Sequence, residues 1–311
     1  MSESDLTQPT PVRLSRLGEL LLSKNQLNLH QIELIAKEQD ARGSRFGDAA
    51  VALGFLSQAQ LDAALDQQFG YDNNAVLVGK VDPVLTILHE PFSHAAEQIR
   101  RLRSELVLRF EENACVKLVV ISPDRGEGKS YIAASLAISL AQLGKRTLLV
   151  DADLRTSSQH TLFGLGRRDG LSSVLAKRLP LEQAVIQVMP KLQILPAGPP
   201  PPNPLEILRA PHLDNLLDGY ANQFDACIVD SYSAGLASDA QMVANQIGCV
   251  VVVALQDQTS MSALRLTLDD MRAADVEVLG CILNRGGDGS TTPTVVAGKS
   301  GIKNAIKRGW W

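Results

Sequence analysis

Long hydrophobic runs are missing from this chain of 311 residues. The longest apolar run, Cys249 to Leu255, is far too short to span a bilayer as a helix. The N-terminus is polar and acidic, and it lacks the basic and apolar parts of a secretion signal. We therefore expect a cytoplasmic protein that reaches a membrane only through a partner or through its own tail.

The chain also has few cysteines and no excess of positive charge. The net charge of −4 gives no general attraction to nucleic acid, so an anion site must be local. The chain has only four cysteines, and their spacing matches neither a metal site nor a disulfide framework. We expect them to be thiols in a reducing compartment. They are Cys115, Cys227, Cys249 and Cys281.

The most informative feature that is present is a glycine-rich segment, residues 122–130, between an apolar run and a helix-like one. In such a turn, backbone N–H groups and a helix N-terminus surround phosphate oxygens. Lys129 would reach the terminal phosphates and Ser130 would bind Mg²⁺. Pro123 replaces the usual first glycine, and a simple strand-to-helix turn is the alternative. The residues predicted to bind ATP here are Gly126, Glu127, Gly128, Lys129, Ser130 and Tyr131.

Strand-like runs alternate with helix-like ones beyond residue 92. This alternation predicts an α/β fold, a P-loop NTPase domain with a mostly parallel, helix-flanked sheet and ligands at the C-terminal strand ends. The predicted strands are Leu118 to Ser122, Thr147 to Asp151, Leu192 to Pro196, Ala226 to Asp230, Cys249 to Leu255 and Val278 to Leu283.

Three carboxylates end two of these strands. Asp151 and Asp153 follow one strand, and Asp230 closes another. A single aspartate at a strand end is usually a helix cap, but three beside one phosphate loop favour a metal-dependent site. We predict that Lys129, Asp151 and Asp153 are catalytic, and that Ser130, Asp153 and Asp230 hold Mg²⁺.

Together, the phosphate loop, the Val-Asp-Ala-Asp-Leu-Arg segment and the later strand aspartate resemble the bacterial tyrosine kinases of exopolysaccharide synthesis. The resemblance covers about residues 92 to 285 and is closest to the chain-length-determinant (EpsG) type. It implies an ATP- and Mg²⁺-dependent kinase that works with an inner-membrane chain-length (copolymerase) protein and is peripheral at that membrane. It also implies that Asn284 contacts adenine.

A charged segment has the Glu-x-x-Arg-x-x-Arg spacing by which this family assembles rings. Glu97, Arg100 and Arg103 lie near one face of a helix, where they could meet a neighbouring subunit. The alternative is a solvated helix with an internal ion pair of little energetic value. By the family resemblance, Glu97, Arg100 and Arg103 would hold subunits together in a homo-oligomeric ring.

The chain departs from the family pattern at its tyrosines. Only Tyr71, Tyr131, Tyr220 and Tyr232 are present, and none lies in the C-terminal tail that this family phosphorylates. One alternative is therefore a non-catalytic ATP-binding scaffold. Another is a positioning ATPase of the partitioning or septum-site type, which Asp124 disfavours because that class has a lysine at this position.

Residues 13–72 contain a repeat with an offset of 29 residues. The first copy runs from Arg16 to Gln39 and the second from Arg45 to Gln68, each 24 residues long. Apolar spacing predicts two helices in each copy. The repeat resembles the cyclic di-GMP-binding domain of type II secretion and pilus ATPases. By that resemblance the ligand contacts are Arg16, Gly18, Arg45 and Gly47; a simple packing module is the alternative.

The remaining segments carry fewer signals. We predict a disordered leader at 1–12, a linker at 73–91, the P-loop domain at 92–286 and a basic tail at 287–311. Within the tail, Ile302, Ile306 and Trp310 would share one helix face among cations, which favours contact with an anionic membrane surface. A disordered basic tail is the alternative.

Overall fold

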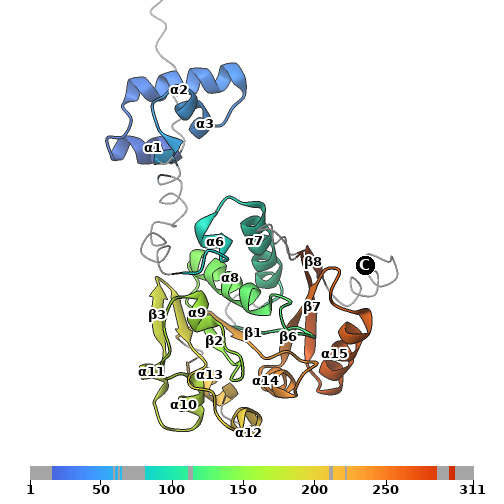
Figure 1. The fold of residues 1–311 in the computed structure, drawn as a ribbon. Coiled ribbons are helices and arrows are strands. Elements are labelled where there is room, and N and C mark those ends of the chain that lie inside the picture. Colours follow the sequence, from blue (N-terminus) through green and yellow to red (C-terminus); the bar gives the residue numbers. More distant parts are fainter. Residues whose placement is uncertain are drawn as a thin grey trace, which may run out of the picture. The chain divides into compact units, whose positions relative to one another are not determined.

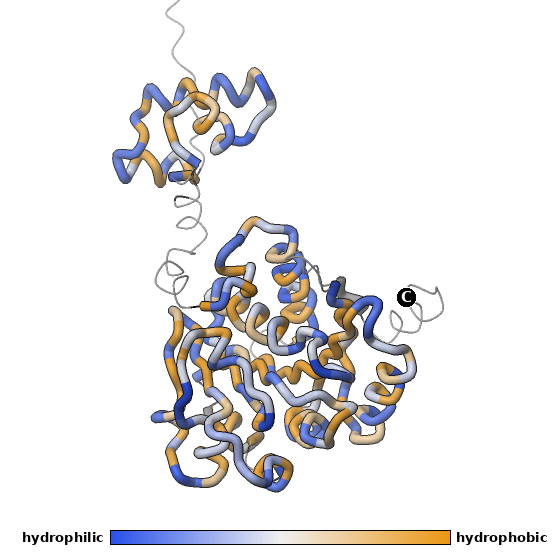
Figure 2. The backbone as a smooth tube through the Cα atoms, viewed as in Figure 1, coloured by the Kyte–Doolittle hydropathy of each residue, from blue (hydrophilic) through white to orange (hydrophobic). Residues whose placement is uncertain are grey.

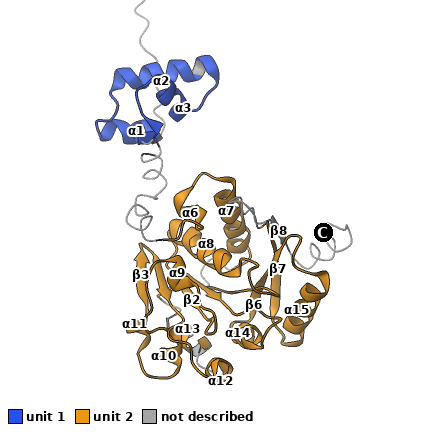
Figure 3. Cartoon of the chain, in the orientation of Figure 1, with its two compact units in different colours: residues 1–73 blue, residues 74–311 orange. Residues whose placement is uncertain are grey.

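The computed structural model describes residues 16–58, 60–61, 64, 81–110, 115–209, 213–220, 223–285 and 294–297. The chain divides into two compact units between Asn73 and Asn74 (Figure 3). The predicted leader, residues 73–80 of the predicted linker and the predicted tail helix lie outside the described residues, as does Tyr71. Among the described helices, none is long and apolar enough to cross a bilayer.

The larger unit is built on one eight-stranded sheet with the order β3-β4-β2-β5-β1-β6-β7-β8 (Figure 1). The central strands from β4 to β7 pair in parallel, and β3 and β8 are added antiparallel at the two edges. This confirms the predicted fold class. The strands are β1 (Val116–Ile121), β2 (Thr147–Asp151), β3 (Ile186–Met189), β4 (Leu192–Leu195), β5 (Ala226–Asp230), β6 (Cys249–Leu255), β7 (Glu277–Asn284) and β8 (Thr294–Ala297).

Helices cover both faces of this sheet. Because side chains alternate along a strand, Leu118 and Val120 of β1 face one core while Val119 and Ile121 face the other. The helices on the first face are α6 (Thr86–His89), α7 (His94–Val107), α8 (Lys129–Gln142) and α9 (Gln159–Leu162). Those on the second are α10 (Leu171–Leu175), α11 (Leu181–Ala184), α12 (Pro204–Arg209), α13 (Leu213–Tyr220), α14 (Asp239–Ile247) and α15 (Met261–Ala273).

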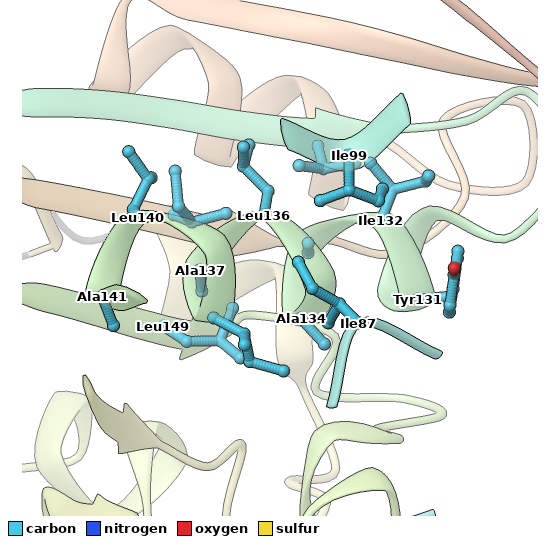
Figure 4. Close-up of a cluster of buried hydrophobic side chains, with 14 of the residues drawn as sticks. Ile87, Ile99, Tyr131, Ile132, Ala134, Leu136, Ala137, Leu140, Ala141 and Leu149 are labelled. Carbon is cyan, nitrogen blue, oxygen red and sulfur yellow. The ribbon is translucent and has the colours of Figure 1, made fainter. Parts of the chain in front are cut away.

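Helix α8 is buried nearly all round and holds the phosphate loop in place. Figure 4 shows it between Ile99 of α7 on one side and Ile87 and Leu149 on the other. A helix with apolar residues on every face must lie inside a core. In the hydropathy view, the apolar segments accordingly gather inside the larger unit (Figure 2). The start of α8 is therefore rigidly placed at the sheet.

The structure corrects the predicted boundaries of the larger unit. Residues 81–91, predicted as linker, contribute to its core, because Val81, Leu85 and Ile87 are buried in one cluster with residues of α7 and α8. Residues 294–297, predicted as tail, form strand β8, which pairs with β7. Each segment contains a short apolar run. The prolines and polar residues beside it make this apolar pattern hard to recognise in the sequence.

The smaller unit contains the predicted helical repeat. Its helices are α1 (Arg16–Ser23), α2 (Leu29–Arg42) and α3 (Phe46–Ala52), followed by helical residues 58, 60, 61 and 64. Leu21, Ile32 and Ile35 are fully or almost fully buried at its centre. The two copies therefore bury one shared apolar core.

Turn and cap geometry repeats with the same offset of 29 residues. Two positions after the first helix of each copy comes a residue with positive φ, Asn25 (55°) in one and Gly54 (71°) in the other. Asparagine tolerates this left-handed conformation better than most residues, which explains why it can replace the glycine. In each copy, a backbone N–H is capped by the residue three positions before it, Gln31 by Asn28 and Gln60 by Ser57.

Candidate active site

The phosphate loop joins β1 to α8, as predicted. Gly126 (φ 79°) and Gly128 (φ 92°) both adopt the left-handed conformation that other residues rarely take. Gly128 is the N-cap of α8, a 14-residue helix, and offers no side-chain cap to its first N–H groups. These N–H groups and the helix dipole are therefore directed at the space where an anion would bind.

Lys129 lies beside Asp153, one of the two aspartates at the end of β2. Its Nζ is 3.7 Å from Oδ2 of Asp153, and the two side chains are only 11% and 2% exposed. Asp153 also accepts hydrogen bonds from the N–H (2.7 Å) and hydroxyl (2.9 Å) of Thr156. The lysine charge is thus held at the loop by a partner that is itself fixed.

Asp151 and Asp230 are paired in register across β2 and β5, and both are fully buried. Burial raises the pKa of Asp151 well above its usual value, and the nearby charges of Asp230 and Asp153 raise it further. The pKa of Asp230 is also raised by burial, although Lys129 partly opposes this. A cation bound nearby would stabilise the ionised forms of these carboxyl groups, so the pair favours cation binding.

Gln159 connects these groups and was not predicted. Its Nε2 donates to Oδ2 of Asp230 (2.8 Å) and to the carbonyl of Ser130 (3.0 Å), while its N–H donates to Oδ2 of Asp151 (3.1 Å). A single glutamine carries no sequence signal for such a role. The role of Gln159 is evident only from the fold, in which α9 lies against the sheet.

The residues present fit a magnesium nucleotide. Among the residues that the structure describes, Oδ1 of Asp230 is buried and has no hydrogen-bond partner, and a hydrogen bond from the Ser130 side chain lowers the pKa of the same carboxyl group. Within the described part of the chain, no three Asp, Glu, His or Cys side chains form a ready metal cage. This suits Mg²⁺, which usually keeps several waters and binds through phosphate and one or two protein oxygens.

Glu127 and Asn284 brace the phosphate loop from within. Burial raises the pKa of Glu127, whose carboxyl accepts hydrogen bonds from the N–H of Asp124 (2.8 Å) and the hydroxyl of Thr259. Asn284 donates to the carbonyl of Glu127 (3.0 Å), and its own Oδ1 is buried without a partner. That free acceptor is available to an amino group such as the one of adenine.

The tyrosines nearest the site point in different directions. The Tyr131 hydroxyl lies 3.1 Å from Oγ1 of Thr86, so its side chain belongs to the core and only its backbone remains for phosphate. Tyr232 is 7% exposed and lies between two guanidinium groups, at 5.1 Å from Arg125 and 5.5 Å from Arg155. Arg125 of the phosphate loop is therefore in contact with the tyrosine that follows β5.

The charged face of α7 has partners within its own chain. Arg100 donates to Glu97 (3.2 Å) and to the carbonyl of Pro91, and Arg103 donates to the carbonyl of Ser139 in α8 (3.2 Å). Glu97 is 68% exposed, whereas Arg100 is 15% exposed. These contacts match the alternative of an internal ion pair. Of Glu97, Arg100 and Arg103, only Glu97 has a largely exposed side chain.

In the smaller unit, the four predicted ligand contacts lie near helix starts. Arg16 begins α1, with Gly18 in its first turn, and Arg45 precedes α3 with an exposed side chain. A Cβ on Gly47 would lie 2.7 Å from Cδ1 of Leu61. Gly47 is therefore needed for packing between helices, a role that the prediction of close approach to a ligand did not include.

Comparisons with known proteins agree with this geometry. A family model described as ParA, NUBPL iron-transfer P-loop NTPase, matches residues 113–291. Tyrosine-protein kinase YwqD of Bacillus subtilis is 35% identical over 196 residues, which is 63% of this chain and 83% of that protein. The kinase domain of Escherichia coli tyrosine kinase ETK superposes with a TM-score of 0.63 at 29% identity, covering 66% of this chain and 81% of that one.

Some relatives are much longer. Tyrosine-protein kinase ptk of Acinetobacter johnsonii is 32% identical over 191 residues, which is 61% of this chain but only 26% of that protein. The matched region thus spans about a quarter of the length of this relative and of two Ralstonia relatives. The matches to YwqD, ptk and the ETK kinase domain each leave more than a third of this chain uncovered.

Proposed function

Because the chain belongs to the ParA class of P-loop NTPases and, within it, to the bacterial tyrosine-kinase family, we propose that it binds ATP with Mg²⁺ and phosphorylates tyrosine on a partner protein. The observation that carries this proposal is the 3.7 Å approach of Lys129 to Asp153 beside two buried carboxyl groups. A strand-to-helix turn with no ligand would not need four charges in its interior.

Each residue has a distinct role in this proposal. The bound nucleotide supplies the phosphoryl group, and Lys129 offsets the charge of its terminal phosphates. Ser130, Asp153 and Asp230 orient the metal and its waters. Asp151 and Asp153 polarise the acceptor hydroxyl, and the raised pKa of Asp151 suits it to accept a proton. The free Oδ1 of Asn284 accepts from adenine.

The partner in this proposal is an inner-membrane chain-length (copolymerase) protein of exopolysaccharide synthesis, as in kinases of the EpsG type. The chain would then be cytoplasmic and peripheral at that membrane, with its basic tail at the surface. The missing tail tyrosines support an acceptor on the partner rather than on this chain. A neighbouring copy would meet the exposed Glu97 if the chain forms a ring.

A non-catalytic ATP-binding scaffold is the second candidate. It is favoured by the contact between Arg125, in the phosphate loop, and Tyr232, two residues after Asp230, because this pairing occupies the edge of the nucleotide site. The positioning-ATPase candidate has weaker support, because Asp124 stands at the signature lysine position and its N–H is bound to Glu127.

One experiment separates these candidates. The full chain, with the partner's cytoplasmic segment, is incubated with γ-labelled ATP and Mg²⁺, and phosphotyrosine is detected by mass spectrometry. The kinase proposal expects label on partner tyrosines that is lost in Asp151→Asn. ATP binding without any label supports the scaffold, and phosphate release stimulated by lipid vesicles supports the positioning ATPase.

We further propose that the smaller unit binds cyclic di-GMP. The repeat geometry supports this, since Arg16 and Arg45 lie at the starts of equivalent helices, Arg16 as the first residue of α1 and Arg45 just before α3, and guanidinium groups pair well with phosphates. Calorimetry of the full chain with cyclic di-GMP tests it. Binding should disappear in Arg45→Ala and persist in Arg42→Ala, since Arg42 is also exposed but pairs with Glu38. No heat with the unmodified chain would rule this proposal out.

A further inference from the structure

A cavity of about 700 Å³ opens directly beside the site, and no function has yet been given to it. It begins at Leu154, the residue after Asp153. Thr156 lines the cavity and also makes two hydrogen bonds to Asp153, the partner of Lys129. Through Thr156, the cavity lies next to the catalytic groups. Its volume is typical of a specific binding pocket.

The walls of this cavity are fixed to one another. The segment after α9 is bonded to the loop after β4 through Leu171 N–H to the Pro196 carbonyl (2.7 Å) and Ser172 N–H to the Ala197 carbonyl (2.9 Å). A Cβ on Gly170 would lie 2.0 Å from the Pro196 oxygen, so only glycine permits this approach. A cavity built this way exists before its ligand arrives, which lowers the entropic cost of binding.

The cavity is basic in an otherwise acidic protein. Arg155, Arg167 and Arg168 line it, with Asp169 as its only acidic residue. Arg155 is already paired with Asp239, and Asp169 accepts from Ser173. Arg167 and Arg168 are exposed, and neither has an ion pair among the described residues. These two guanidinium groups are available for carboxylates of a ligand.

Another part of the cavity lining is apolar and stiff. It consists of Pro196, Pro199 and Pro200 together with Leu154. Rigid proline rings and a leucine side chain suit an aromatic ring, which binds through its large contact area at little cost in its own entropy. The cavity thus offers apolar contact for one aromatic side chain and two cations for its acidic neighbours.

We propose that this cavity is the acceptor site and that it selects a partner segment in which tyrosine is flanked by acidic residues. The proposal rests on the kinase function proposed above and names the substrate class of that site. The chain's own tail does not fit, because it is basic and has no tyrosine. Arg167 and Arg168 act as specificity-determining residues.

Peptide binding tests the proposal without relying on catalysis. Three fluorescein-labelled peptides are titrated into the full chain: tyrosine between two glutamates on each side, tyrosine between lysines, and alanine between glutamates. We expect the first to bind about tenfold more tightly than either of the others, from two exposed ion pairs and one buried ring. Equal affinities would overturn the proposal.

Charge reversal supplies the second arm. Arg167→Glu/Arg168→Glu should lose the acidic peptide and favour the lysine peptide, and the milder Arg167→Gln/Arg168→Gln should fall between. The matched control is Lys177→Glu/Arg178→Glu, an adjacent exposed pair outside the cavity lining. Unchanged preference in the cavity variants, or equal loss in the control, contradicts the assignment.

Melting temperature and ATP affinity of each variant are measured alongside. Wild-type chain that prefers the acidic peptide but does not transfer phosphate would contradict the kinase function and leave the cavity assignment supported. Wild-type chain that transfers phosphate with no preference among the peptides would contradict the cavity assignment alone.

Discussion

Tyr232 accepts a hydrogen bond from the guanidinium of Arg125, and the Cζ of that arginine lies 5.1 Å from the centre of the tyrosine ring. Arg125 belongs to the phosphate loop, whereas Tyr232 follows Asp230 by two residues. The backbone supports the same connection, because Gly235 N–H donates to the Pro123 carbonyl (2.9 Å). A second backbone bond, from Ala234 N–H to the Ser122 carbonyl (2.8 Å), joins the loop to the segment after β5 as well.

This contact predicts graded effects of changes at Tyr232. Tyr232→Phe keeps the ring beneath Arg125 and removes the acceptor, so ATP affinity should fall by about fivefold, corresponding to about 1 kcal/mol for one hydrogen bond. Tyr232→Ala removes both contacts and should cost more. Titration with a fluorescent ATP analogue measures both, and wild-type affinity in Tyr232→Ala would contradict a role in holding the loop.

The two loop glycines should differ in tolerance. Both have positive φ, so alanine at either is strained by about 1–3 kcal/mol. A Cβ on Gly128 would also lie 2.2 Å from Nδ2 of Asn284, whereas one on Gly126 would meet nothing within 4 Å. Gly128→Ala should therefore lower the unfolding free energy more than Gly126→Ala in urea titrations. Equal losses would show that the contact with Asn284 does not matter.

Gln159→Leu should weaken magnesium binding. It removes both side-chain hydrogen bonds that hold Asp230 and the Ser130 carbonyl, which leaves a buried carboxyl with less support at a cost of about 1–3 kcal/mol. The half-saturating Mg²⁺ concentration for ATP binding should rise, while Gln183→Leu, an exposed control, should not change it. A pure loss of thermal stability with unchanged Mg²⁺ dependence would argue against a positioning role.

Stabilisation by ATP with Mg²⁺ should grow with pH. The folded-state pKa values of Asp151 and Asp230 are raised above their unfolded values of about 4. As the pH rises from the unfolded pKa to the folded pKa, these groups therefore destabilise the ligand-free protein increasingly. Metal and nucleotide favour their ionised forms. The difference in melting temperature with and without ligand should therefore increase as the pH is raised from about 5, just above the unfolded pKa values, toward 8. A constant difference would contradict ionisation linked to binding.

The parts that the sequence predicts well are those governed by continuous local patterns. β6 (Cys249–Leu255) is a run of apolar residues and could hardly be anything but a buried strand. Asp151 and Asp230 end parallel strands, so their meeting followed from sheet geometry once the alternation was recognised. Paired turns at Asn25 and Gly54 likewise followed from the repeat.

What the sequence did not predict depends on contacts between distant segments. Gln159 reaches Asp230 across 71 positions of sequence. Val81 and Leu85 looked like linker because Pro83 separates them, yet both are buried by packing against helices that come later. The cavity walls near Gly170 and Pro196 also come together only in the folded chain. Such pairings leave no periodic signal in a single sequence.

Calorimetric titration of the full chain with ATP and Mg²⁺, for wild type and Lys129→Ala, tests the central claim most directly. The exposed control is Lys177→Ala. The account predicts binding in wild type and control, and a loss of at least about a hundredfold in Lys129→Ala, as expected when a largely buried cation facing phosphate is removed. Equal affinity in all three proteins would contradict the account.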